Sequence, residues 1–124
     1  MKANEFAIEL SKFAEAVKVE HVRLMKKVTL ELLGRVTQKS PVDTGRFRAN
    51  WMVGINATDY TTTESTVNDT IERGMATLTP LAFGEAIHVS NNLPYANKLE
   101  HGYSDQAPEG ILSVSVEEIK AFLK

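Results

Sequence analysis

Asp43, Thr44 and Gly45 form the tripeptide of this chain whose residue types could do chemistry. Two facing carboxylates that share one proton can activate water for peptide hydrolysis, because one acts as the base while the other stays protonated. A chain of 124 residues with one such carboxylate would have to dimerise to supply the second. Chain length alone permits this arrangement.

The surroundings of this tripeptide favour a structural role. It is the sequence found around the catalytic carboxylate of aspartic proteases, an almost all-β family that places it after an apolar strand and before a small residue. Here a long helical pattern and Ser40-Pro41-Val42 precede it, and Arg46 follows. We favour a turn that Asp43 and Thr44 shape and cap; a dimeric aspartic protease is the alternative.

No other catalytic or ligand-binding motif stands out. The three histidines, His21, His88 and His101, lack the short spacing of a metal site, and the chain contains no cysteine. It also has no phosphate-binding glycine loop and no Gly-x-Ser-x-Gly sequence. We therefore expect no enzyme activity, no metal and no cofactor.

Arg46, Arg48 and Trp51 lie close enough in sequence to form a nucleic-acid patch, with guanidinium groups on phosphates and an aromatic ring for stacking. The alternative is that Phe47 and Trp51 anchor the turn to the core while the arginines are solvated or salt-bridged. A formal charge of −2 weighs against a broad phosphate-binding face. We favour the interpretation in which Phe47 and Trp51 anchor the turn, and we expect an interface role for the two arginines. A small nucleic-acid-binding protein is the alternative.

The bulk composition is that of one ordinary domain covering residues 1–124. Hydrophobic residues make up 43% and charged residues 24% of the chain, and no apolar run approaches the roughly 20 residues of a membrane helix. The first residues fit neither a secretory signal nor a basic transit peptide. We expect the protein to stay in the compartment where it is made.

A long amphipathic helix is expected over about residues 4–38. Its apolar positions recur at helical spacing, and Ser40-Pro41 ends it. Such a helix would be about 50 Å long, against roughly 35 Å for a compact domain of this size. Either it breaks, near Glu20-His21 or at Gly34, or an apolar stripe packs on another subunit; the stripe comprises Phe6, Leu10 and Phe13.

The remaining elements are shorter. Alternating patterns predict strands at about 51–56, with one buried face, and at 86–90, with Ile87 and Val89 inward and His88 outward. A threonine-rich mobile loop is expected over 57–70, and then a short helix capped by Asn68, Asp69 or Thr70. Two further helices are expected, one between Pro94 and Gly102 and one at about 111–123, where the helical spacing outlasts a strand-like alternation. The predicted fold class is α+β: a long N-terminal helix and shorter helices on a small, mainly antiparallel sheet.

Three motifs in the order and approximate spacing of a known family extend over about residues 5–120. The first runs from Ser40 to Trp51 and includes Pro41, Asp43, Thr44 and Gly45; the second comprises Pro94-Tyr95-Ala96 and Glu100-His101-Gly102; the third is Ser104 to Gly110, with Pro108. Together they resemble the tail-completion proteins of tailed phages, which join head to tail at the neck. The threonine-rich loop and a rather short C-terminus depart from that pattern.

The resemblance implies an α/β subunit that assembles into a ring, commonly six-fold, at the head-tail junction of a virion. Its partners would be copies of itself, the head connector or adaptor proteins, and the tail tube or terminator protein, with genomic DNA passing through the centre. Its role would be binding and assembly rather than chemistry. The expected location is the virion, after synthesis in the host cytoplasm.

Overall fold

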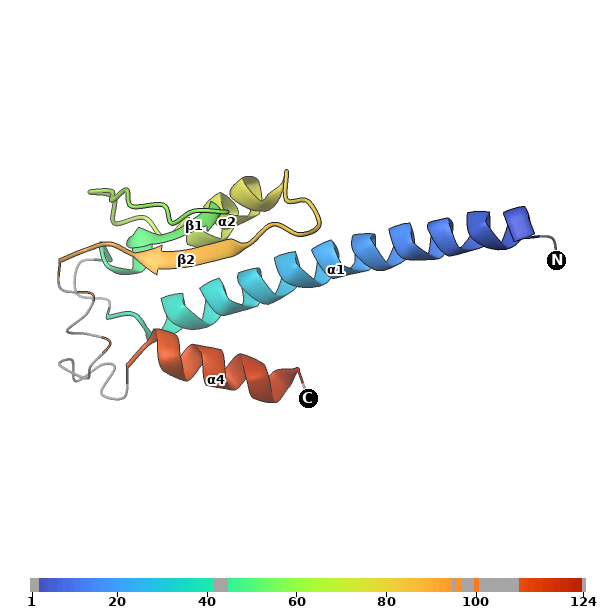
Figure 1. Ribbon diagram of the computed structural model, residues 1–124. Helices are drawn as coiled ribbons and strands as arrows, with labels where there is room; N and C mark the ends of the chain where they lie inside the picture. The colour runs from blue at the N-terminus through green and yellow to red at the C-terminus, as the bar shows by residue number, and fades with distance from the viewer. Residues whose placement is uncertain (1–2, 42–44, 95, 97–99, 101–109, 124) are drawn as a thin grey trace.

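The computed structural model describes residues 3–41, 45–94, 96, 100 and 110–123; for residues 3–9 only the helical backbone is described. Among these residues are a long helix, two shorter α-helices and a two-stranded antiparallel sheet. Figure 1 shows the sheet and α2 on one side of the C-terminal half of α1, and α4 on the other side. The α+β fold class predicted from the sequence is confirmed.

Helix α1, Ala3–Lys39, is a single uninterrupted helix of 37 residues. Of the two alternatives for this long helix, a break near Glu20-His21 or at Gly34 is therefore wrong, and packing of the apolar stripe on another subunit stays a prediction. Glu20 and His21 are exposed, so polar residues there are compatible with a straight helix. Gly34 costs the helix about 1 kcal/mol relative to alanine, but the fully buried Leu33 and Val36 on either side hold that turn against the core.

The sheet pairs β1, Trp51–Ile55, with β2, Ile87–Asn91, in a register that sets Trp51 opposite Asn91 and Ile55 opposite Ile87. The first strand ends one residue earlier than expected because Asn56 has a left-handed backbone (φ 63°). This conformation breaks the extended chain and favours a short polar side chain.

The expectation of one buried face on β1 is wrong, because Trp51, Met52 and Val53 are all buried. Val53 faces α2, and the sulfur of Met52 is covered by Arg73, whose Nη1 lies 3.2 Å away. On β2, Ile87 and Val89 pack against the core, as expected. His88 is half buried, like the rest of β2, and its Nδ1 lies 3.5 Å from the Thr58 hydroxyl.

Helix α2, Thr70–Leu78, begins after Asp69, one of the three expected N-cap residues. The Asp69 side chain makes no capping hydrogen bond. Its Oδ1 instead accepts a hydrogen bond of 2.8 Å from Nε of Arg73, one turn into the helix, where the charges also pair favourably.

The threonine-rich segment between Ile55 and Thr70 has no regular secondary structure, but its backbone is tied to the sheet. The carbonyl of Asp59 accepts hydrogen bonds from Ser90 Oγ (3.1 Å) and Asn92 Nδ2 (2.7 Å). The Asp59 carboxylate accepts two more from Thr61, which lower the pKa of Asp59. The segment expected to be a mobile loop is therefore attached to the sheet by these hydrogen bonds.

Helix α4, Leu112–Phe122, confirms the choice of a helix over a strand at the end of the chain. It runs antiparallel to α1, since Glu118 pairs with Lys39 and Arg35 near the end of α1, whereas Phe122, further along α4, lies beside Leu24, earlier in α1. The expected helix from Pro94 to Gly102 lies largely outside the described residues. The elements meet in one buried core of Leu33, Val36, Phe47, Trp51, Val53, Leu78, Leu93 and Ile111.

Candidate assembly interface and its supporting turn

The turn after α1 is joined to β1 through Ser40 and Trp51. The Ser40 hydroxyl donates to the Val36 carbonyl (2.6 Å) and accepts a hydrogen bond of 2.9 Å from Nε1 of Trp51. The Trp51 ring meets Phe47 edge to face, with centroids 5.9 Å apart, and both residues are 4% exposed. These contacts agree with the interpretation of Phe47 and Trp51 as anchors of the turn.

Gly45 adopts φ +77°, a backbone conformation that disfavours residues with a Cβ. A Cβ at this position would also lie 2.8 Å from the carbonyl oxygen of Thr66. Its own carbonyl accepts a hydrogen bond from the backbone N–H of Ala49, which leads into the 3₁₀ turn η1, Arg48–Asn50. Glycine is thus required by this turn, while Asp43 and Thr44 lie outside the described residues.

Asn50 links the turn to the threonine-rich segment. It is fully buried, and its amide group donates to the carbonyls of Arg46 (2.7 Å) and Thr63 (3.0 Å). Its Oδ1 accepts the backbone N–H of Thr63 at 2.9 Å. Asn50 could not be singled out from the sequence, because only the folded chain brings Thr63 next to it.

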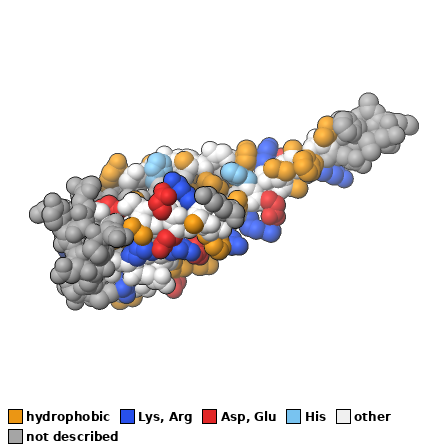
Figure 2. Space-filling view, turned by 90° about the horizontal axis from the view of Figure 1, so that it is seen from below, with side chains coloured by type: hydrophobic (Ala, Val, Ile, Leu, Met, Phe, Trp, Pro, Cys, Tyr) orange, Lys and Arg blue, Asp and Glu red, His pale blue; other side chains and the backbone are white. Residues whose placement is uncertain are grey.

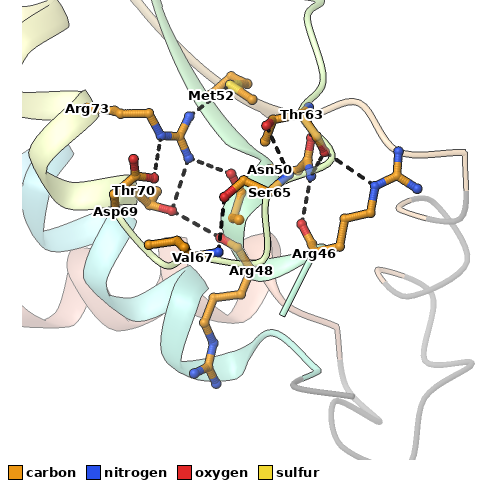
Figure 3. Close-up of polar contacts among 11 residues, drawn as sticks. Arg46, Arg48, Asn50, Met52, Thr63, Ser65, Val67, Asp69, Thr70 and Arg73 are labelled. Atoms are coloured by element: carbon orange, nitrogen blue, oxygen red, sulfur yellow. Dashed lines mark hydrogen bonds and ion pairs between the residues drawn. The ribbon is translucent and has the colours of Figure 1, made fainter. Parts of the chain in front are cut away.

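Arg46 and Arg48 point in different directions (Figure 3). Arg46 pairs with Glu64 at 3.0 Å and also contacts the Thr63 carbonyl. Arg48 reaches the Ser40 carbonyl at the end of α1 with Nη2, at 3.5 Å, where a cation suits the helix dipole. The two guanidinium groups therefore do not form one phosphate-binding patch, and an interface role for them stays a prediction.

Arg73 is a second residue that sequence reasoning missed. Besides pairing with Asp69, its guanidinium group donates through Nη2 to the Ala49 carbonyl and to Thr70 Oγ1. Thr70 in turn donates to the Arg48 carbonyl at 3.1 Å. These bonds, drawn in Figure 3, tie the first turn of α2 to the 3₁₀ turn. The sequence does place a basic residue one turn after Asp69. This spacing predicts only the ion pair within α2 and not the bonds to the 3₁₀ turn.

Glu100 caps the N-terminus of α4. Its carboxylate accepts hydrogen bonds from the backbone N–H groups of Ile111 (3.1 Å), Leu112 (2.8 Å) and Ser113 (2.8 Å), and from the Ser113 hydroxyl. Burial acts to raise the pKa of Glu100, but these bonds outweigh it and the pKa lies below its ordinary value. Gly110 has φ +95°, and a Cβ there would lie 2.6 Å from the Glu100 carbonyl oxygen.

Replacing Glu100 by glutamine is expected to destabilise the protein by about 1 kcal/mol at pH 7, because one acceptor oxygen and the charge at the helix N-terminus are lost. A carboxylate with a lowered folded pKa stabilises above its unfolded pKa and loses that contribution as the pH falls through its folded pKa. The gap between wild type and Glu100→Gln should therefore narrow below about pH 4.5. Urea unfolding monitored by circular dichroism at pH 7, 5, 4 and 3 measures this difference in the free energy of unfolding.

The matched control for the cap is Glu117→Gln, on the exposed face of α4 in an exposed pair with Lys120. Such pairs contribute little to stability, so this variant should unfold like wild type at each pH. A gap between wild type and Glu100→Gln that stays constant from pH 7 to pH 3 would contradict the role of the ionised carboxylate.

The N-terminal half of α1 projects beyond the body of the molecule (Figure 1). It carries Leu10, Phe13 and Val17 on one helical face, with exposed fractions of 51%, 68% and 49%. For Phe6, which the sequence places on the same face, the side chain lies outside the described residues. We call the three described residues the α1 stripe; space-filling atoms in Figure 2 show hydrophobic side chains on this projecting part.

The same face of α1 continues into the body, where α4 covers it incompletely. A small hollow of about 60 Å³ remains between the two helices, next to the end of α4. We call this hollow and its rim the α1–α4 groove; its lining residues are Leu24, Lys27, Val28, Glu31, Ile119, Phe122 and Leu123.

Other kinds of site find little support in the described ranges. Within them, no group of three or more His, Asp or Glu side chains could hold a metal ion. No helix of the described chain is long and apolar enough to cross a membrane. Of the motif residues, Pro41, Trp51, Pro94, Glu100 and Gly110 are described, whereas Tyr95, Gly102 and Pro108 lie outside the described residues.

The candidate site is thus the exposed apolar surface on the projecting half of α1, and the turn that Ser40 and Trp51 join lies at the other end of this helix. Searches against family models, curated proteins and solved structures find no match to this chain.

Proposed function

We propose that this protein is a structural subunit of a phage or prophage virion that forms a ring at the head-tail junction and completes or joins the tail. Two things support the proposal: the three motifs in family order, and an α+β fold with a long N-terminal helix, as the resemblance implies. The protein works by binding, without a catalytic site or cofactor.

The observation that carries the proposal is the projecting half of α1 with its exposed apolar stripe. In proteins, most of the stability of a helix comes from packing of an amphipathic face. Phe13 is 68% exposed in the single chain. In an assembly, neighbouring subunits cover such a face and remove its apolar side chains from water.

The proposed partners follow from the place of the ring. Copies of the chain, commonly six, form the ring; the connector or adaptor proteins dock on one side, and the tail tube or terminator protein on the other. DNA passes through the centre without sequence-specific contacts, and a net charge of −2 suits a channel in which it does not stick. The virion is the proposed location, and no membrane is involved.

Electron microscopy of the purified protein, alone and mixed with its connector or with tails, tests the proposal. We expect rings in the mixture, or end-caps on the tails. If the protein neither forms rings nor decorates tails or connectors at any concentration tested, the proposed function is wrong.

A further inference from the structure

The face of α1 that carries the stripe is the face that α4 covers further along the helix. Leu24 lies two turns beyond Val17 and lines the α1–α4 groove together with Ile119 and Phe122 of α4. The contact with α4 therefore shows what this face accepts: an amphipathic helix that lies along it with apolar side chains turned inward.

Apolar surface is left uncovered at the open end of this contact. Phe122 and Leu123 are 60% and 53% exposed, and Leu24 beneath them is 51% exposed. With the stripe, six apolar residues each present on the order of 100 Å² to solvent. The sum, roughly 600 Å², is at the upper limit for a monomer. The stripe and the open end of the groove each contribute about half of it, roughly 300 Å², so residues around them must supply the rest of the roughly 800 Å² per partner of a specific interface.

We propose that the α1 stripe of one copy packs against the α1–α4 groove of a second copy. This inference rests on the proposed ring, which brings several copies of the chain together. A second copy fits because the stripe is itself an amphipathic helix of the kind that the face already accepts. One contact of this type covers the exposed stripe of one copy and the open groove of the other.

The chain cannot fill its own groove. Phe13 and Leu24 are separated by 11 residues of straight helix, which places them about 16 Å apart along the axis. The stripe and the groove are also different sets of residues, so their contact is head-to-tail. Contacts of that type close into rings when the rotation between copies allows it.

Cysteine pairs test the contact directly, because the native chain contains no cysteine. Single variants Phe13→Cys and Phe122→Cys are mixed in equal amounts and oxidised, and mixed disulfides are measured on a non-reducing gel. Since a disulfide needs Cα atoms within about 7 Å, we expect efficient cross-linking between the two variants. Leu10→Cys with Leu123→Cys is a second pair, which keeps the Phe13 ring in place.

The control is Glu15→Cys mixed with Phe122→Cys. Glu15 is exposed and lies two residues from Phe13, on the opposite side of the helix. We expect a several-fold lower cross-linking yield than for the stripe variants. Equal yields, or Phe13→Cys cross-linked only to itself, would overturn the contact.

The contact and the proposed function can fail separately. Rings seen by electron microscopy without mixed disulfides in either pair would refute the stripe-groove contact and leave the ring intact. Mixed disulfides in a protein that never forms rings or binds tails would support the contact and refute the proposed function.

Discussion

Replacing Trp51 by alanine is expected to lower the free energy of unfolding by about 3–5 kcal/mol, the usual cost of truncating a large buried aromatic side chain. Trp51 is 4% exposed, packs edge to face on Phe47 and donates a hydrogen bond to Ser40. It therefore joins the end of α1, the turn and the sheet. Because whole domains are stable by only about 5–15 kcal/mol, urea unfolding monitored by circular dichroism should show a large shift.

Trp51→Phe is the matched control for this prediction. It keeps an aromatic ring in the core but loses the indole N–H, while the Ser40 hydroxyl retains its bond to the Val36 carbonyl. The expected loss is about 1–2 kcal/mol, from the smaller ring and the missing hydrogen bond. A Trp51→Ala variant as stable as Trp51→Phe would contradict the anchoring role.

Replacing both Leu10 and Phe13 by glutamate is expected to abolish assembly without unfolding the subunit. Both side chains are at least half exposed, and exposed substitutions usually change stability by no more than about 0.5 kcal/mol. In a packed interface, by contrast, two buried unpaired carboxylates are strongly unfavourable. Light scattering and electron microscopy measure assembly, and thermal unfolding checks the fold.

Val19→Glu is the control for the assembly variant. Val19 is 59% exposed on the same projecting part of α1, but on a different face from the stripe. It introduces one glutamate, half of the charge added by the double variant, into the same helix and should leave assembly unchanged. If the double variant assembles as well as Val19→Glu does, the stripe is not the interface.

The elements set by local patterns were predicted well from the sequence. The period of apolar residues placed α1 and α4, and the alternation around Trp51 and Val89 placed both strands within one residue. These patterns are local, because a helix or a strand can be predicted from the spacing of its own apolar residues. A break in α1, one of the two alternatives for the long helix, was wrong, since exposed polar residues are compatible with a helix and Gly34 lies between the buried Leu33 and Val36.

The contacts made by polar side chains were much harder to predict. Asn50 binds a segment 13 residues away, and Glu100 caps a helix that begins 12 residues later. The sequence analysis placed Glu100 within a family motif, but its bonds to the N-terminus of α4 came from the structure. Hydrogen bonds of this kind depend on orientation and distance, and no sequence period reports either.

By itself, the sequence determined the α+β class, the long helix and the turn rich in proline, glycine and aromatic residues. These follow from backbone preferences and apolar spacing, which act within a few residues. Only the tertiary structure decided that the helix is continuous, that Arg46 and Arg48 diverge, and that one face of α1 is covered by α4 at one end and exposed at the other. Burial of a helical face depends on which distant elements reach it, and that is a property of the folded chain.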